Sequence, residues 1–174
     1  MAATSGWVAT GSAATVYNES IGGDLSNDAM SPTVLSSGTD SVFGGLLDDQ
    51  FVPANADRDD HFVISDLPGG GTAQFDFSAT IDNSNLGVQF TFSTLAGGTL
   101  YTSPVYMADN SGTTGAIAVP ISGEIKISVQ NVNSDEGGSP ATAWEVSTND
   151  VVPEPSTSAL VALGALLALR RSRK

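Results

Sequence analysis

Three aspartates stand within four consecutive positions, as Asp57, Asp59 and Asp60 of the stretch NADRDD. Carboxylates this close together repel one another unless solvent or a cation relieves the repulsion. The stretch therefore has two interpretations. It is either a solvated acidic loop that precedes a strand, or part of a site in which carboxylate oxygens hold a hard metal ion. Asn18 and Glu19 could join such a site if the first strand of the protein lies beside this turn.

His61 follows these aspartates directly and is the only histidine of the chain. With Asp59 and a serine it could form a Ser-His-Asp triad, but the sequence contains no Gly-x-Ser-x-Gly nucleophile elbow. His61 alternates with Phe62, so we expect an exposed strand histidine. The chain has no cysteine, and nothing singles out a pair among its 19 acidic residues for glycoside hydrolysis. We therefore expect that the protein is not an enzyme.

Charge is distributed very unevenly along the chain. Residues 1–154 contain all 19 acidic residues against two basic ones, Arg58 and Lys126, which gives a formal charge of −17. Such a surface repels the phosphates of nucleic acids and attracts divalent cations, so nucleic acid is excluded as a partner. The simpler interpretation is that the acidity keeps an exported or salt-adapted protein soluble.

Strict period-two alternation runs through the middle of the chain. The stretches TAQFDFSATI, LGVQFTFS and GEIKISVQ each place apolar residues on one face of a strand and polar residues on the other. Glycine-rich turn signals such as LPGGG and SDEGGSP separate them. The pattern predicts an all-β fold, a single antiparallel, jelly-roll-like β-sandwich of residues 14–149. Weaker strands are expected at residues 14–19, 41–47, 61–66, 99–106 and 142–147.

The C-terminus has a different character. Residues 157–169 carry no charge and show no polar face, and four basic residues stand within the last five positions. A helix of that length spans about 20 Å, so it could enter a membrane of roughly 30 Å only with the help of flanking arginines. Basic residues after the apolar run favour a cytoplasmic C-terminus with the body outside. The alternative is an ordinary buried C-terminal helix.

This tail closely resembles the PEP-CTERM sorting signal of Gram-negative bacteria, also called the ice-binding protein C-terminal domain, a label that does not imply ice binding. The resemblance rests on Val152, Pro153, Glu154, Pro155 and Ser156, the apolar run, and Arg170 and Arg171. It implies an exported protein that is transiently anchored in the inner membrane, processed near Pro-Glu-Pro by an exosortase, and then found at the cell surface or outside the cell. Such proteins are associated with exopolysaccharide and biofilm. Because residues 1–13 do not look like a signal peptide, we expect them to be a flexible segment that lacks the true export signal.

The body loosely resembles bacterial pre-peptidase C-terminal domains, which are jelly-roll modules of secreted proteins. Asp57, Asp60 and Phe62 match the Asp-x-x-Asp-x-Phe step of that family, and an earlier acidic segment of the chain resembles its first conserved group. The resemblance implies a calcium site, and calcium is the only cofactor that the sequence suggests. The candidate ligands are Glu19, Asn27, Asp28, Asp57, Asp59 and Asp60.

The sequence thus divides into residues 1–13, a sandwich of residues 14–149 and a sorting signal of residues 150–174. The leading interpretation is an exported surface or matrix protein with a structural or interaction role, with exosortase, the membrane and exopolysaccharide as partners. The rival is a calcium-dependent or carbohydrate-binding module, since aromatic side chains can stack on sugars. Trp7, Trp144, Tyr101 and Tyr106 are the aromatic candidates, although a strand tryptophan more often fills the core. A secreted hydrolase comes third.

Overall fold

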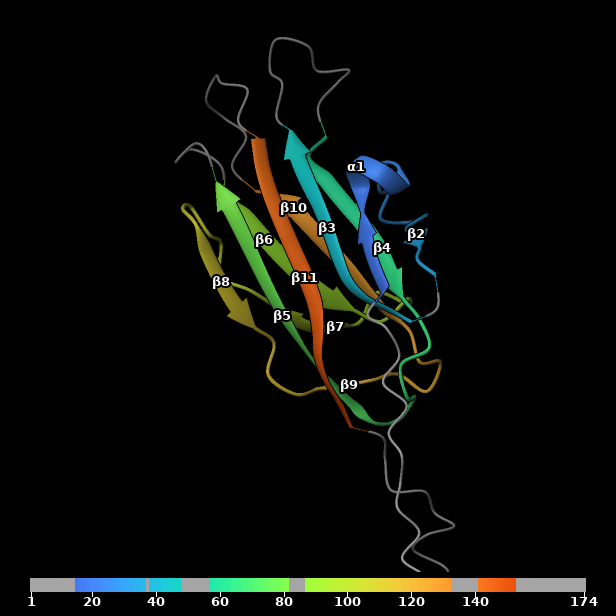
Figure 1. Ribbon diagram of the computed structural model, residues 1–174. Coiled ribbons are helices and arrows are strands. Elements are labelled where there is room, and N and C mark those ends of the chain that lie inside the picture. The colour runs from blue at the N-terminus through green and yellow to red at the C-terminus, as the bar shows by residue number, and fades with distance from the viewer. Residues whose placement is uncertain (1–14, 37, 48–56, 82–86, 133–140, 153–174) are drawn as a thin grey trace, which may run out of the picture.

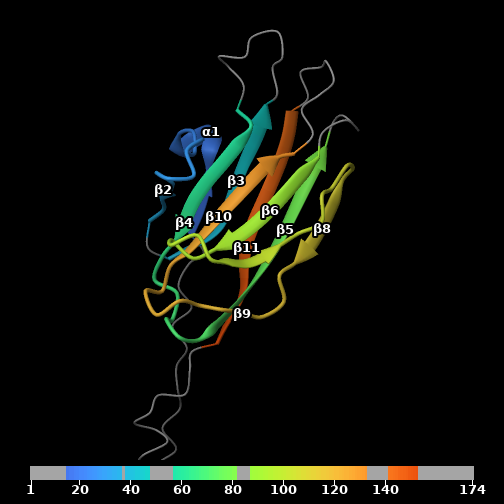
Figure 2. The same cartoon turned by 180° about the vertical axis from the view of Figure 1, so that it is seen from behind.

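The computed structural model describes residues 15–36, 38–47, 57–81, 87–132 and 141–152, which form two β-sheets packed face to face (Figures 1 and 2). The first sheet has the order β1 (Thr15–Asn18), β3 (Thr39–Leu47), β11 (Ala141–Val152), β5 (Thr72–Ile81) and β8 (Asn110–Thr113), and β9 (Ile117–Ala118) also pairs with β5. The second sheet has the order β2 (Thr33–Val34), β4 (Asp59–Ile64), β10 (Ile125–Asn131), β6 (Val88–Ser93) and β7 (Thr99–Thr102). One short helix, α1 (Glu19–Gly22), follows β1.

The predicted all-β sandwich is confirmed, and its strands are mostly antiparallel as expected. Two pairings differ, because β1 runs parallel to β3 and β2 runs parallel to β4. β1 is an edge strand of the first sheet and β2 is an edge strand of the second. The segment between them therefore crosses from one sheet to the other and covers one side of the sandwich.

The alternating stretches of the sequence build the core. β5 coincides with the predicted stretch TAQFDFSATI, and its Phe75 and Phe77 are buried. The ring of Phe77 lies 4.8 Å from that of Phe90, which belongs to β6 in the opposite sheet. The core is thus an aromatic layer between two sheets, each of which turns its polar residues outward.

Several strands have other bounds than the sequence suggests, and three of the differences matter most. β4 begins at Asp59, so Asp59 and Asp60 are strand residues and not part of a loop. β11 continues through Val152, well beyond the expected end at residue 147. β7 ends at Thr102, and Tyr106 pairs separately with Val88.

No helix in the part of the chain that the structure describes is both long enough and apolar enough to cross a lipid bilayer. The expected C-terminal helix of residues 157–169 and the expected flexible segment of residues 1–13 lie outside the described residues.

The aromatic layer makes a direct prediction about stability. Truncation of the completely buried Phe90 by Phe90→Ala should lower the free energy of unfolding by about 3–5 kcal/mol, through lost burial and a cavity. Ile121→Ala, at a side chain that is 93% exposed, is the control and should change it by less than about 0.5 kcal/mol. Urea denaturation of the full chain measures both. Equal small losses for the two variants would mean that Phe90 does not pack between the sheets.

Candidate metal site and neighbouring pockets

Four carboxylates converge on one side of the sandwich. One oxygen from each of Glu19, Asp24, Asp57 and Asp60 lies within 4.8 Å of the others, and we call this group the acidic site. Glu19 opens α1, Asp24 follows that helix, Asp57 precedes β4, and Asp60 is the second residue of β4. Figures 1 and 2 show α1 beside β3 and β4 at the side of the sandwich that the crossing segment covers. The segment that crosses between the sheets supplies Glu19 and Asp24, and the chain at and just before the start of β4 supplies the two aspartates, so the four residues meet at one place.

Glu19 is held firmly by backbone groups. Its Oε1 accepts a hydrogen bond from Leu25 N at 2.7 Å, and its Oε2 accepts one from Gly45 N at 2.9 Å. The helix start is fixed by Asn18, whose Oδ1 accepts from Ser20 N at 3.0 Å. A Cβ atom at Gly44 would collide with the ring of Trp144 and with Oε2 of Glu19, so a glycine is needed where Glu19 enters the site. The position of this carboxylate is therefore determined before any ion binds.

Asp60 is the most unusual member of the acidic site, because its side chain is 0% exposed. Its Oδ2 accepts a hydrogen bond from Nε1 of Trp144 at 2.8 Å, and the indole of Trp144 stacks on Phe62 with ring centroids 5.6 Å apart. Its Oδ1 has no hydrogen-bond partner among the described residues. A buried, unpaired carboxylate oxygen is costly unless the group binds a proton or a cation.

The electrostatics of the metal-free site follow from this crowding. Burial, followed by the charges of Asp24 and Glu19, raises the pKa of Asp57 to about 7. Burial, followed by the charges of Glu19 and Asp57, raises the pKa of Asp60 even more strongly. Without a cation the site therefore retains protons near neutral pH, where exposed carboxylates have lost theirs.

The candidate ligands from the sequence divide into two groups. Glu19, Asp57 and Asp60 lie in the acidic site, and Asn27 lies beside it. With its amide in the orientation that satisfies its neighbours, Asn27 donates to Oδ1 of Asp57 at 2.7 Å and to the carbonyl oxygen of Asp59. Asn27 therefore orients the carboxylate of Asp57.

The remaining two candidates lie outside this group of four. Oδ1 of Asp28 accepts from Met30 N at 2.8 Å and so closes a local turn. Oδ1 of Asp59 accepts from Nε2 of Gln130 at 3.4 Å. Asp24 is the member that the sequence reasoning missed. Its only signal is its place directly after the IGG turn that ends α1.

The expectation of an exposed His61 is wrong, because this side chain is only 3% exposed. The residue does face away from Phe62, but the crossing segment pairs along the edge of β4, and His61 N donates to the carbonyl of Ser26 at 2.8 Å. Its Nδ1 lies 2.8 Å from Oγ of Ser128, and burial lowers the pKa of the ring. Within the described ranges no carboxylate hydrogen bonds to this ring, so the pair is not completed to a triad.

Three of the four aromatic residues considered for sugar stacking belong to the core or pack against it. Trp144 is 3% exposed, and Tyr101 and Tyr106 pack against the buried phenylalanines. Trp7 lies outside the described residues. Trp144, Tyr101 and Tyr106 therefore form no exposed platform.

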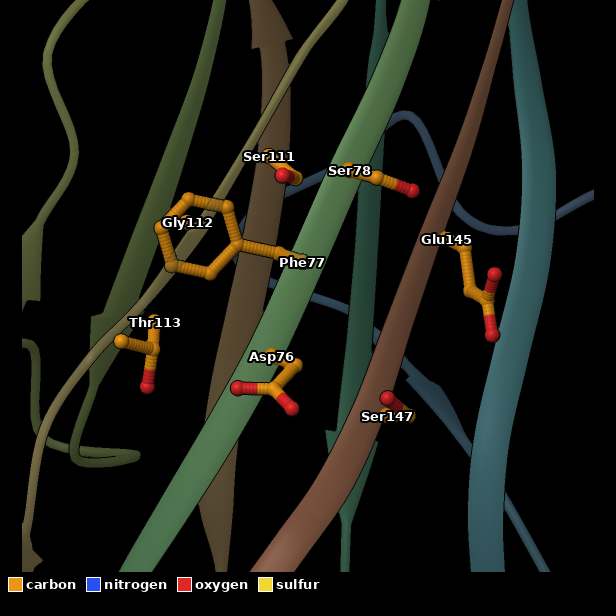
Figure 3. Close-up of a pocket in the computed structure, with 8 residues that line it drawn as sticks. All are labelled: Asp76, Phe77, Ser78, Ser111, Gly112, Thr113, Glu145 and Ser147. Atoms are coloured by element: carbon orange, nitrogen blue, oxygen red, sulfur yellow. The ribbon is translucent and has the colours of Figure 1, made fainter.

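One open pocket, of about 360 Å³, lies on the outer face of the first sheet (Figure 3). Asp76 from β5 and Glu145 from β11 are its two carboxylates. Asp76 accepts a hydrogen bond from Nδ2 of Asn149 at 2.7 Å, whereas Glu145 extends toward β3 and away from Asp76 in Figure 3. The two carboxylates do not converge on a common point, as paired catalytic carboxyl groups would.

A second open pocket, of about 540 Å³, adjoins the acidic site. Glu19 and Asp24 line it together with Trp144, whose indole is bonded to Asp60. Phe43 of β3 and Ala143 of β11 also line it. We call it the side pocket, and through it Glu19 and Asp24 face solvent.

The described residues thus form a β-sandwich with a group of four carboxylates beside an open pocket. Residues 151–174 match the PEP-CTERM protein-sorting motif, which confirms the resemblance of the tail. The motif implies an exported protein that an exosortase recognises and that is sorted by way of the membrane.

Comparison with solved structures gives distant likenesses. A structure described as "CBM4 structure and function" is 15% identical with a TM-score of 0.37, over 52% of this chain and 61% of that one. This chain therefore spans less than two thirds of that protein. PliG of Aeromonas hydrophila, a periplasmic inhibitor of g-type lysozyme, is 13% identical with a TM-score of 0.38, over 79% of this chain and 100% of that one. No curated protein matches the chain.

The crowded carboxylates predict how the stability of the metal-free protein depends on pH. A carboxyl group whose pKa is higher in the folded than in the unfolded state favours folding when protonated, so its contribution falls as pH rises toward the folded value. Between about pH 6.5 and 8.5 the protein in a chelator should lose roughly 1–3 kcal/mol of stability. Burial lowers the pKa of His61 in the folded state, so His61 adds only a small opposing rise near the lower end of this window, where the unfolded-state imidazole still loses its proton.

Thermal unfolding of the full chain at several pH values in a chelator measures this dependence. Asp57→Asn should flatten it, and Glu124→Gln, which removes a charge outside the acidic site, should not. A melting temperature that rises across this window would contradict the burial of these carboxyl groups.

Proposed function

We propose that this chain is an exported cell-surface or extracellular-matrix protein whose β-sandwich binds calcium in the acidic site. The observation that carries the proposal is the convergence of four carboxylates around Asp60, which is completely buried and has one unpaired oxygen. A bound cation relieves the repulsion among the carboxylates and gives that oxygen a ligand bond.

Calcium fits this site better than other common metals. The four residues offer only hard oxygen ligands, and no histidine or cysteine belongs to the group, which disfavours zinc and other softer metals. Calcium accepts six to eight oxygens in flexible geometry, whereas magnesium requires near-ideal octahedral geometry and loses its water reluctantly. The four carboxylates come from two separate parts of the chain and share no regular helix or strand, which suits the more tolerant ion.

Bound calcium would also strengthen the attachment of the N-terminal segment to the second sheet. Glu19 and Asp24 belong to the crossing segment, whereas Asp57 lies just before β4 and Asp60 lies at its start. An ion that joins them fastens the N-terminal segment to the second sheet. Extracellular calcium modules bind with dissociation constants of about 10⁻⁴–10⁻³ M, so such a site fills outside the cell.

The role that we propose is structural or interactive and not enzymatic, within the exopolysaccharide or biofilm layer. The sorting motif supports export, and the strongly acidic body supports a setting rich in divalent cations. The buried His61–Ser128 pair and the divergent Asp76 and Glu145 supply no assembled catalytic group.

Calcium binding is tested by thermal unfolding of the full chain. At a calcium concentration one hundred times the dissociation constant, linkage adds about 2.7 kcal/mol, or roughly 5–10 °C for a domain of this size. Magnesium should give a smaller shift. The double variant Asp57→Asn, Asp60→Asn should abolish the shift and should raise the stability of the metal-free protein at pH 8, because buried charges are removed.

Glu124→Gln is the matched control, since it removes one carboxylate outside the acidic site and should keep the full calcium shift. A wild-type melting temperature that does not respond to millimolar calcium would refute the site. A calcium-induced shift that persists in the double variant would show that calcium binds outside the acidic site.

The sorting proposal is tested by mass. In cells that make the protein, the extracellular form should end near Pro155, because the exosortase processes the tail there. Replacement of all four basic residues of the tail by serine should leave the protein misrouted and unprocessed, because positive charge then no longer holds the C-terminus in the cytoplasm. These residues are Arg170, Arg171, Arg173 and Lys174. Intact-mass analysis of the extracellular protein decides the question, and the presence of residues 170–174 on it would contradict the proposal.

A further inference from the structure

We infer that calcium in the acidic site completes its ligand set with vicinal hydroxyl groups of a neutral saccharide bound in the side pocket. The inference rests on the proposed calcium site and names the ligand that this site presents to the outside. It does not involve the pocket of Figure 3, which lies on another part of the first sheet.

The coordination number of calcium leaves positions for a ligand that does not come from the protein. If each of the four residues gives one oxygen, the ion has four protein ligands, and calcium takes six to eight. Hydrogen bonds already orient the carboxylates: Glu19 accepts from two backbone groups, and one oxygen of Asp60 accepts from Trp144. These bonds restrict bidentate binding, so two or more positions of the ion remain for water or a ligand.

The side pocket is where those positions become accessible. Glu19 and Asp24 line both the acidic site and the pocket, so the ion lies at the pocket wall. Its volume of about 540 Å³ is within the range of small-ligand sites. Gly44 helps to keep this region open, because a side chain there would enter the space between Trp144 and Glu19.

The charge of the site selects neutral ligands. Four ionised carboxylates around one calcium ion leave a net charge of −2, and the body around them is strongly acidic as well. A uronate or phosphate would be repelled. Neutral hydroxyl groups can bind calcium through oxygen and at the same time donate their protons to the carboxylates.

Two other residues that line the pocket suit a sugar ring. Phe43 is half-buried on the outer face of β3, where it offers an aromatic surface to the C–H groups of a pyranose. Ala143 is exposed on the neighbouring strand β11 and leaves space beside it. Two carboxylates of the acidic site, an aromatic ring and a small exposed residue thus line the same pocket, whereas no residue of the acidic site lines the pocket of Figure 3.

The test measures binding of the full chain to mannan, a neutral polysaccharide with vicinal hydroxyls, and to alginate, a polyuronate. Calorimetry or affinity electrophoresis in millimolar calcium should show binding to mannan, loss of that binding in EDTA, and little binding to alginate. Phe43→Ser and Ala143→Gln should each weaken mannan binding at least about tenfold while the calcium-induced rise in melting temperature is unchanged. Ser111→Ala, in the pocket of Figure 3, is the matched control and should bind mannan as the wild type does.

The outcomes separate the two proposals. A calcium-induced rise in melting temperature without mannan binding overturns the saccharide inference and leaves the calcium site in place. Mannan binding that persists in EDTA, or that Ser111→Ala weakens and Phe43→Ser does not, overturns it too. Preference for alginate over mannan overturns the charge argument. If calcium does not bind at all, both proposals fall.

Discussion

The hydrogen bond between Trp144 and Asp60 joins the two sheets of the sandwich, since Trp144 belongs to β11 and Asp60 to β4. It holds a carboxylate where the alternation of β4 would otherwise place an apolar residue, on the same face as Phe62 and Ile64. The neighbouring features depend on that position. Trp144 stacks on Phe62, Gly44 makes room for the indole, and Glu19 lies in the space that Gly44 leaves.

A buried carboxylate needs a counter-charge, and basic residues are scarce in this strongly acidic protein. Arg58 and Lys126 are the only basic residues before the tail, and Lys126 donates to the carbonyl of Ala29, outside the acidic site. The structure instead adds three more carboxylates, which increases the repulsion and raises the pKa values of Asp57 and Asp60. This arrangement has a simple explanation if a divalent cation belongs there, and it has none as a stabilising feature of an isolated fold.

The sequence predicted the parts of the fold that depend on local pattern. Alternation predicted both ends of β5 correctly. It also predicted that Phe90, Ile125 and Ile127 lie in the core, because alternate residues of a strand point to the same face of its sheet. The burial of His61 could not be predicted in this way, since it depends on a crossing segment that pairs with β4 from far along the chain. Asp24 was missed for the same reason. Asp60, by contrast, shares the inward phase of Phe62 and Ile64, so the alternation itself contained the signal that this aspartate points into the core.

The acidic site and the sorting tail are linked through the place where each acts. A tail that directs export means that the body meets little free calcium before it crosses the membrane and much more afterwards. Without the ion, Asp57 and Asp60 must either retain protons or repel their neighbours, and either requirement weakens the attachment of the crossing segment to β4 near neutral pH and above. With the ion, the same carboxylates hold the two together. Calcium binding as proposed therefore makes the sandwich less stable before export and more stable outside the cell. The cause is that the carboxylates repel one another without calcium and are held together by the ion once it binds.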